Sequence, residues 1–251
     1  AAARLMGLDH GRMVEAMGLA FHRAGGSFQA NSDGSLAVRL IQAFASQNGI
    51  ACATLAERGM TGGRNFIEGI AGYFHLYCND ERDLEGLLGD LGDRWDIRAL
   101  GFKKYPSCGG AATSTDAALA ILAEHEIAPR EIEKVEVRLA GTANYRLVGH
   151  RFEVGPYPTV NAQFNASYCV ANALLRGFPV IEHFTADRVT DPEVLALIEK
   201  VQVRPDLELA TEHNPVGAIV EVTTRDGSRY RAEAEYMGGK GDVDPLPRET
   251  L

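Results

Sequence analysis

Residues 102–110 group side chains that could hold an anion. Two adjacent lysines, Lys103 and Lys104, are followed by a tyrosine and a proline, and then by Ser107, Cys108 and two glycines ahead of a helical pattern. The backbone N–H groups at a helix start and an ammonium group can converge on one anion. A solvated turn between two domains is the alternative, and by composition alone it is the more frequent meaning of such a stretch.

A second candidate is Tyr168, at the end of the stretch 161–168, where polar side chains interrupt an otherwise apolar helical pattern. A polar group buried without a partner costs about 1 to 3 kcal/mol, so such groups are usually hydrogen-bonded or functional. A tyrosine whose hydroxyl reaches the surface is the alternative interpretation.

Several other kinds of site are not indicated by the sequence. The four cysteines form no CxxC pair, and the seven histidines show no HxH or HExxH spacing, so no metal site is predicted. There is no GxSxG elbow of a serine hydrolase. The glycine-rich stretches 59–64 and 238–242 match neither a Walker motif nor a dinucleotide fingerprint.

The charge balance points away from nucleic acid and membranes as partners. The formal net charge is -9 and the sequence pI is about 5.3, so the average field repels polyanions. No apolar run approaches the roughly 20 residues that span a bilayer, and no secretory segment opens the chain. Scattered cysteines fit a reducing compartment, so we expect a cytoplasmic protein whose anionic substrate binds in a local basic pocket.

The elements that must position these residues change character near Trp95. The first part of the chain is nearly all helical in pattern, whereas the second part mixes helices and strands, which predicts an α+β protein. We expect a helical domain over 1–101, an α+β domain over 102–240 and a tail over 241–251. The predicted helices cover 11–23, 37–44, 51–57, 66–78, 81–91, 113–125, 162–176 and a stretch after Asp191, and the predicted strands cover 132–139, 201–207, 218–225 and 228–236.

Several patches, in one order along the chain, resemble the MmgE/PrpD family of cofactor-independent enzymes that act on small polycarboxylates. These patches lie at residues 1–9, 54–62, 66–69, 103–108, 116–119, 162–177 and 220–227. The resemblance implies a helical domain, a lid-like α+β domain with the active site between the two, no cofactor, and a homodimer as the usual assembly.

The resemblance also implies roles for single residues. The lysine of the family's K-x-Y-P-S-C motif falls on Lys103, and the tyrosine of its polar helix falls on Tyr168. These two are the expected catalytic residues, with Lys103 as electrostatic stabiliser or acid/base and Tyr168 as proton donor or carboxylate ligand. Ser107 and Cys108 lie beside the lysine and are expected to line the substrate pocket, and Lys104 is expected to make a weaker substrate contact.

The chain also departs from the family pattern. Many members carry K-x-L-H where this sequence has residues 38–41, so that lysine and histidine are missing, and Arg39 is expected to supply a substrate-binding charge instead. A histidine that often follows the motif cysteine is replaced by Ala112. The family's first helices would precede Ala1, which predicts that the chain is truncated at its N-terminus.

The chemistry that the resemblance implies is proton abstraction next to a carboxylate, for which a base and stabilising cations are needed. We expect a hydro-lyase that dehydrates a small hydroxylated di- or tricarboxylate, such as a 2-methylcitrate-like acid. An epimerase or decarboxylase on the same scaffold is an alternative within the enzyme class. A non-catalytic carboxylate-binding or oligomerisation fragment is an alternative outside it.

Overall fold

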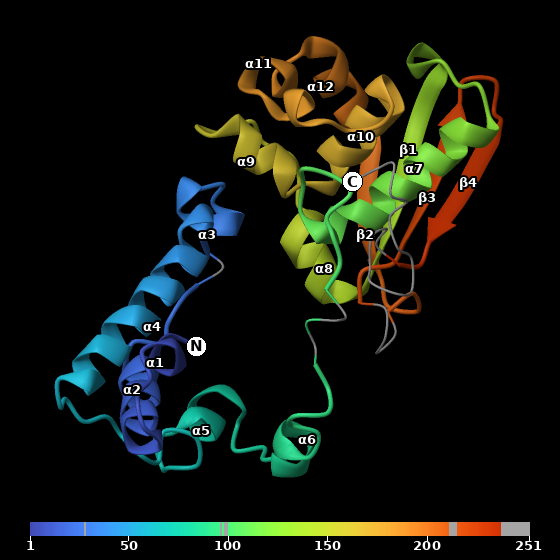
Figure 1. The fold of residues 1–251 in the computed structure, drawn as a ribbon. Coiled ribbons are helices and arrows are strands. Elements are labelled where there is room, and N and C mark those ends of the chain that lie inside the picture. The colour runs from blue at the N-terminus through green and yellow to red at the C-terminus, as the bar shows by residue number, and fades with distance from the viewer. Residues whose placement is uncertain (28, 96, 98–99, 211–214, 237–251) are drawn as a thin grey trace. The chain divides into compact units, whose positions relative to one another are not determined.

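The protein is described by a computed structural model, traced in Figure 1. The described residues are 1–27, 29–95, 97, 100–210 and 215–236. Within them lie helices and one four-stranded sheet, so the predicted α+β class is confirmed. No helix in these residues is both long and apolar enough to cross a bilayer.

The chain divides into two compact units. Unit 1 comprises residues 1–28 and 36–94, and unit 2 comprises residues 29–35 and 95–251. The division predicted between residues 101 and 102 stays a prediction. The predicted tail, 241–251, lies outside the described residues.

Unit 1 is helical and is built on α2 (His10–His22) and α4 (Ile41–Glu57), which pack against each other. The side chain of Asp9 starts α2 by accepting a hydrogen bond from the backbone N–H of Arg12 at 2.8 Å. Gly18 of α2 lies so close to the loop beyond α4 that a Cβ there would meet a backbone oxygen at 2.5 Å. The other helices of unit 1 are α1 (Ala2–Leu5), η1 (Leu36–Arg39), α5 (Tyr73–Tyr77) and α6 (Leu84–Leu88).

The helices of unit 1 differ from the predicted ones in length. The break predicted at 46–49 is wrong, because α4 runs through it and the hydroxyl of Ser46 donates back to the carbonyl of Gln42 within the helix. The stretch predicted as a helix at 66–78 is helical only in α5. Beyond α5 the chain turns at Asn79 and Asp80, which have φ of 50° and 63°, a conformation that these residue types adopt more readily than most.

The glycine-rich stretch 59–64 binds a carboxylate of its own chain. Glu15 of α2 accepts hydrogen bonds from the backbone N–H of Gly62 at 2.7 Å and from the guanidinium of Arg64 at 2.9 Å. Glu15 is buried, and these two contacts, Gly62 first, hold its pKa below the ordinary value. The stretch is therefore a structural turn held against α2.

Unit 2 contains a sheet with the strand order β2-β1-β3-β4 (Figure 1). The strands are β1 (Ile132–Ala140), β2 (Val201–Asp206), β3 (Ala218–Thr224) and β4 (Arg229–Ala234). β2 runs parallel to β1, and the other neighbours are antiparallel. Val135, Val137 and Leu139 are fully buried, as the alternation in the sequence predicts. The predicted hairpin is confirmed, and Gly227, with φ of 87°, closes its turn.

Three helices of unit 2, α7 (Ala112–Glu124), α8 (Gly141–Val148) and α10 (Ala166–Arg176), pack against this sheet, and α10 carries Tyr168. α7 packs on β3, β4 and α10, and α10 also packs on α12 (Figure 1). α10 is buried from residue 166 to residue 174 and forms the centre of the core. The described helices of unit 2 are α3 (Gln29–Ser32), η3 (Gly109–Ala111), α7 (Ala112–Glu124), η4 (Pro129–Glu131), α8 (Gly141–Val148), α9 (Pro158–Gln163), α10 (Ala166–Arg176), η5 (Ile181–Phe184), α11 (Ala186–Val189) and α12 (Pro192–Ile198).

The single helix predicted over 162–176 is two helices. α9 ends at Gln163, and α10 begins after Asn165, whose side-chain oxygen accepts a hydrogen bond from the backbone N–H of Tyr168 at 3.0 Å. An asparagine in this place caps a new helix more favourably than it continues an old one. The break sets the direction of α10 and so the position of Tyr168.

Candidate active site

Residues 103–108, here called the lysine turn, lead into η3 and α7. α9 holds the turn from both sides. The backbone N–H of Cys108 donates to the carbonyl of Gln163 at 2.7 Å, and the side-chain amide of Gln163 donates to the carbonyl of Pro106 at 2.9 Å. The turn therefore has a fixed backbone on which its side chains are displayed.

Asp116 of α7 anchors the lysine turn. One of its carboxylate oxygens accepts hydrogen bonds from the ammonium of Lys104 at 2.7 Å and from the phenol of Tyr105 at 2.6 Å. The ring of Tyr105 is buried and packs on Phe178, with ring centroids 5.4 Å apart. Burial, reinforced by the Asp116 carboxylate, raises the pKa of Tyr105 well above its usual range. The charge of Lys104 thus faces a carboxylate of its own unit, and its predicted contact with substrate stays a prediction.

Lys103 presents its charge differently. Its side chain is exposed, and its ammonium donates to the carbonyl of Ser107 at 3.1 Å. Within the described part of the chain it forms no ion pair. Burial raises the pKa of the Cys108 thiol, and the charge of this ammonium opposes that rise. The structure therefore brings Lys103, Ser107 and Cys108 together, as the resemblance implies.

The thiols of Cys108, in the lysine turn, and of Cys169, in α10, are poor nucleophiles. Burial raises the pKa of Cys108, and the backbone N–H of Gly110 and the Lys103 charge only partly oppose it. Burial raises the pKa of Cys169 to about 12, against an opposing hydrogen bond from Ser107. Both groups are therefore protonated at neutral pH, and the reactive form of a cysteine is the thiolate. Cys108 fits a role in shaping the site better than one in covalent catalysis.

Tyr168 lies in the core of unit 2. Its side chain is fully buried between the rings of Phe152 and Phe184, whose centroids are 5.6 and 5.5 Å from its own. Its phenol donates to the carbonyl of His183. Burial raises its pKa to about 12, against the opposing charge of Arg176, so the phenol is protonated at neutral pH. Its predicted catalytic role stays a prediction. The phenol of Tyr168 and the ammonium of Lys103 thus bind two different carbonyls.

A polar network continues from Tyr168 along α10. Arg176 donates to the side chain of Asn172 at 3.0 Å and to the carboxylate of Asp191 at 2.9 Å. The amide of Asn172 meets the ring of His183 at 3.3 Å. Burial first, and the nearby arginine charges second, lower the pKa of His183, which keeps its ring neutral. This network fixes the segment whose carbonyl receives the Tyr168 phenol.

Other residues of the site were not found from the sequence. Asp116 lies within one of the patches that resemble the family, and Gln163 lies within the polar stretch before α10, but neither pattern reveals what they bind. The side chain of Ser107, in the lysine turn, acts on the thiol of Cys169 in α10. Within the described residues, no three histidine, cysteine or acidic side chains are grouped so as to hold a metal ion.

Arg39 and Ala112 mark the two departures from the family pattern. Arg39 ends η1 in unit 1, whereas the lysine turn belongs to unit 2, and the predicted substrate contact of Arg39 stays a prediction. Ala112 begins α7 and is buried.

Comparison with known proteins decides the family. Residues 1–85 match the MmgE/PrpD N-terminal domain, and residues 105–251 match the MmgE/PrpD C-terminal domain. The chain belongs to the MmgE/PrpD family. The resemblance found in the sequence is therefore confirmed.

The curated relatives of this MmgE/PrpD chain are decarboxylases by name. It is 23% identical to cis-aconitate decarboxylase of Homo sapiens over 100% of the chain and 51% of the relative. It is 25% identical to cis-aconitate decarboxylase of Aspergillus terreus over 100% of the chain and 53% of the relative. With the cis-aconitate decarboxylase-like protein oryM of Aspergillus oryzae the identity is 24%, over 90% of the chain and 49% of the relative. The chain thus spans about half the length of these relatives.

Proposed function

We propose that this chain supplies part of the active site of a lyase that removes carbon dioxide or water from a small polycarboxylate. Membership of the MmgE/PrpD family and relatives that are cis-aconitate decarboxylases support the reaction class. The observation that carries the proposal is the ammonium of Lys103, which is exposed on a turn fixed by two other elements. In a protein with a net charge of -9, an anionic substrate needs such a local cation.

In this proposal Lys103 binds a substrate carboxylate and stabilises the negative charge that develops beside it. Its present acceptor is a neutral carbonyl at 3.1 Å, so a carboxylate would replace a weaker partner. The ammonium has three donors, and one carbonyl occupies only one of them. Lys103 can therefore take a substrate oxygen without leaving the turn.

The two reactions differ in the bond that breaks. In dehydration, a base removes a proton from the carbon next to a carboxylate, the electron pair forms a double bond, and hydroxide leaves with a proton. In decarboxylation, the carbon–carbon bond to a carboxylate breaks, its electron pair stays on the substrate, and a proton is added there. A cation beside the remaining carboxylate stabilises the charged intermediate in both cases.

The names of the relatives favour decarboxylation over the dehydration expected from the sequence alone. At 23–25% identity we do not carry their substrate over to this chain. A 2-methylcitrate-like substrate remains one candidate among several.

A direct test is to incubate the whole protein with cis-aconitate, citrate, 2-methylcitrate and malate. Released carbon dioxide and the absorbance of any new double bond are measured together. Carbon dioxide release identifies a decarboxylase, and a new double bond without carbon dioxide identifies a dehydratase. Stereochemical inversion alone, detected by chiral chromatography, would identify an epimerase. Tight binding of these acids without any turnover would contradict the proposal and favour a binding fragment.

A homodimer is proposed as the assembly in which the protein acts. Its support is an exposed apolar side of α4, on which Phe44 and Leu55, about three helical turns apart, are 56% and 41% exposed. Exposed apolar side chains gathered on one surface mark contact sites. Sedimentation of the whole protein as a monomer at micromolar concentration would contradict this. A cytoplasmic location and the lack of nucleic-acid or membrane partners stay predictions.

A further inference from the structure

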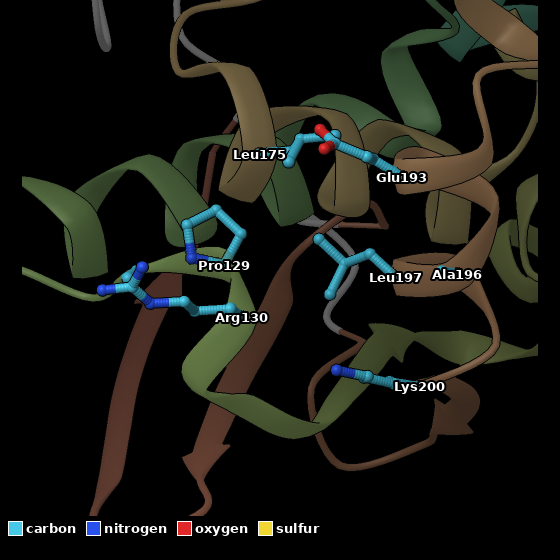
Figure 2. Close-up of a pocket in the computed structure, with 8 residues that line it drawn as sticks. Pro129, Arg130, Leu175, Glu193, Ala196, Leu197 and Lys200 are labelled. Carbon is cyan, nitrogen blue, oxygen red and sulfur yellow. The ribbon is translucent and has the colours of Figure 1, made fainter.

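Unit 2 contains a groove that shares no residue with the lysine turn. Its volume is about 440 Å³, within the roughly 300 to 1,000 Å³ of small-molecule sites. Figure 2 shows its walls, which come from the end of α10, from α12 with Lys200 just beyond it, and from the turn before β1. The lining residues are Ala128, Pro129, Arg130, Leu175, Glu193, Ala196, Leu197 and Lys200.

The walls of the groove are tied to one another without a ligand. Arg176, at the end of α10, pairs with Asp191, which caps α12, at 2.9 Å. The ammonium of Lys200 donates to the carbonyl of Ile132, at the start of β1, at 2.6 Å. Each of the three segments is thus bonded to a second one, and the groove is pre-formed. A pre-formed site binds a ligand at a lower cost in conformational entropy.

The floor of the groove is apolar. Leu197 is buried, and Leu175 and Pro129 are partly buried around it. Ala196 is exposed and contributes only a methyl group, so the wall of α12 is low at this point. An apolar chain laid on this floor would lose contact with water along its length, which stabilises binding by about 0.8 kcal/mol for each fully buried methylene.

The charges around the floor are divided between its two sides. Figure 2 shows Glu193 beside Leu175, whereas Lys200 lies beyond Leu197 and Arg130 extends outward from Pro129. No described residue forms an ion pair or hydrogen bond with the guanidinium of Arg130. The ammonium of Lys200 has donors left after its bond to Ile132. The groove therefore has one cation beyond Leu197, a second at its rim, and a carboxylate beside Leu175 that repels an anion.

We propose that this groove binds a monocarboxylate with an unbranched apolar chain, such as a medium-chain fatty acid. The carboxylate lies against Lys200, with the charge of Arg130 at the rim of the groove, and the chain lies over Pro129 and Leu197. Glu193 disfavours a second carboxylate at the far end of the chain. The site therefore differs in substrate class from the lysine turn, and it is independent of the proposed lyase activity.

The test uses octanoate as the probe and the methyl NMR signals of Leu175 and Leu197 in the whole chain as the readout. Both signals should shift in a saturable manner. From butanoate to octanoate the affinity should rise about two- to fourfold for each added methylene. Octanol, which lacks the charge, should bind about two- to fivefold more weakly than octanoate, as expected for a partly exposed ion pair. Octanedioate should also bind more weakly than octanoate.

Variants locate the binding. Ala196→Phe fills the low wall and should abolish the octanoate shifts, whereas Ala186→Phe, at an exposed alanine of α11, should leave them unchanged. Arg130→Ala should lower the affinity for octanoate part of the way to that for octanol, because Lys200 remains, whereas Arg146→Ala, at an exposed arginine of α8, should not change it. All four positions are exposed, so these changes spare the core.

Three results would overturn the proposal. One is the absence of shifts at Leu175 and Leu197 at millimolar octanoate. Another is equal binding of octanoate and octylamine, since that would remove the role of the two cations. The third is a concentration-dependent dimer that Ala196→Phe dissociates, because the groove would then be a contact between copies of the chain. None of these results depends on whether the protein is a lyase.

Discussion

Replacing Asp116 should loosen the lysine turn, because one carboxylate oxygen holds both Lys104 and Tyr105. In Asp116→Ala the phenol of Tyr105, in a residue only 3% exposed, loses its acceptor. An unpaired buried hydroxyl costs about 1 to 3 kcal/mol. The side chain of Lys104 is 28% exposed and its ammonium can bind water in the variant, so the loss of its ion pair with Asp116 adds at most about 1 kcal/mol. We expect the free energy of unfolding to fall by about 1 to 4 kcal/mol.

Two further variants separate the two bonds. Asp116→Asn keeps an oxygen that accepts from Tyr105 and removes only the charge, so it should cost about 1 kcal/mol or less. In the double variant Tyr105→Phe/Asp116→Ala no hydroxyl is left unpaired. Its cost should therefore be smaller than the sum of the two single costs by about 1 to 2 kcal/mol.

Urea unfolding followed by circular dichroism measures these costs. Hydrogen exchange of the peptides that cover residues 103–124 shows whether the loss is local to the turn and α7. Equal costs for Asp116→Ala and Asp116→Asn, or strict additivity in the double variant, would refute the reasoning. The first result would mean that charge alone matters, and the second that the shared oxygen is not what joins the two side chains.

Other variants test single contacts. The pKa of Tyr168 is raised to about 12, so the unfolded chain loses this proton first and Tyr168 contributes a fall in stability of about 1.4 kcal/mol per pH unit between about pH 10 and 12. Tyr168→Phe should make the slope measured in urea titrations shallower by that amount. Gly110→Ala should destabilise the protein by about 1 to 3 kcal/mol, because the new Cβ would lie 2.3 Å from the side-chain oxygen of Asn144. Adding Asn144→Ala should recover part of the lost stability, measured by thermal unfolding. The pKa of Glu15 is lowered, so the stability that its carboxylate gives unit 1 is present at neutral pH and is lost as the pH falls through that pKa. Glu15→Gln should make the free energy of unfolding depend less on pH in the acid range, measured by circular dichroism.

The elements that can be predicted best from the sequence are those whose signal lies in residues close together along the chain. β1 follows from the alternation of Val135, Val137 and Leu139, because successive side chains of a strand point to opposite faces. The hairpin follows from Gly227, because glycine adopts the positive φ that its turn needs. The long helix of unit 1 was cut short in the prediction because Ser46 and its neighbours resemble a stop signal, whereas in the structure the Ser46 hydroxyl bonds within the helix. Local propensity does not reveal which of the two uses a serine adopts.

The candidate site was predictable in its residues but not in their partners. Lys103, Ser107 and Cys108 come together because they lie on one turn. The anchoring of Lys104 by Asp116 depends on how α7 packs against that turn, which is a tertiary contact that spacing alone does not give. The phenol of Tyr168 binds a backbone carbonyl, and a carbonyl leaves no mark in the sequence.

We propose that the lysine turn displays one catalytic cation, Lys103, whereas Asp116 holds Lys104. The most direct test compares the turnover of Lys103→Met and Lys104→Met in the whole protein, on the polycarboxylate that it converts. Lys103→Met should lower kcat about 10²- to 10³-fold, as expected when one stabilising donor is lost, and Lys104→Met should lower it less than about tenfold. Unchanged kcat in Lys103→Met, with the fold intact by circular dichroism, would contradict the claim.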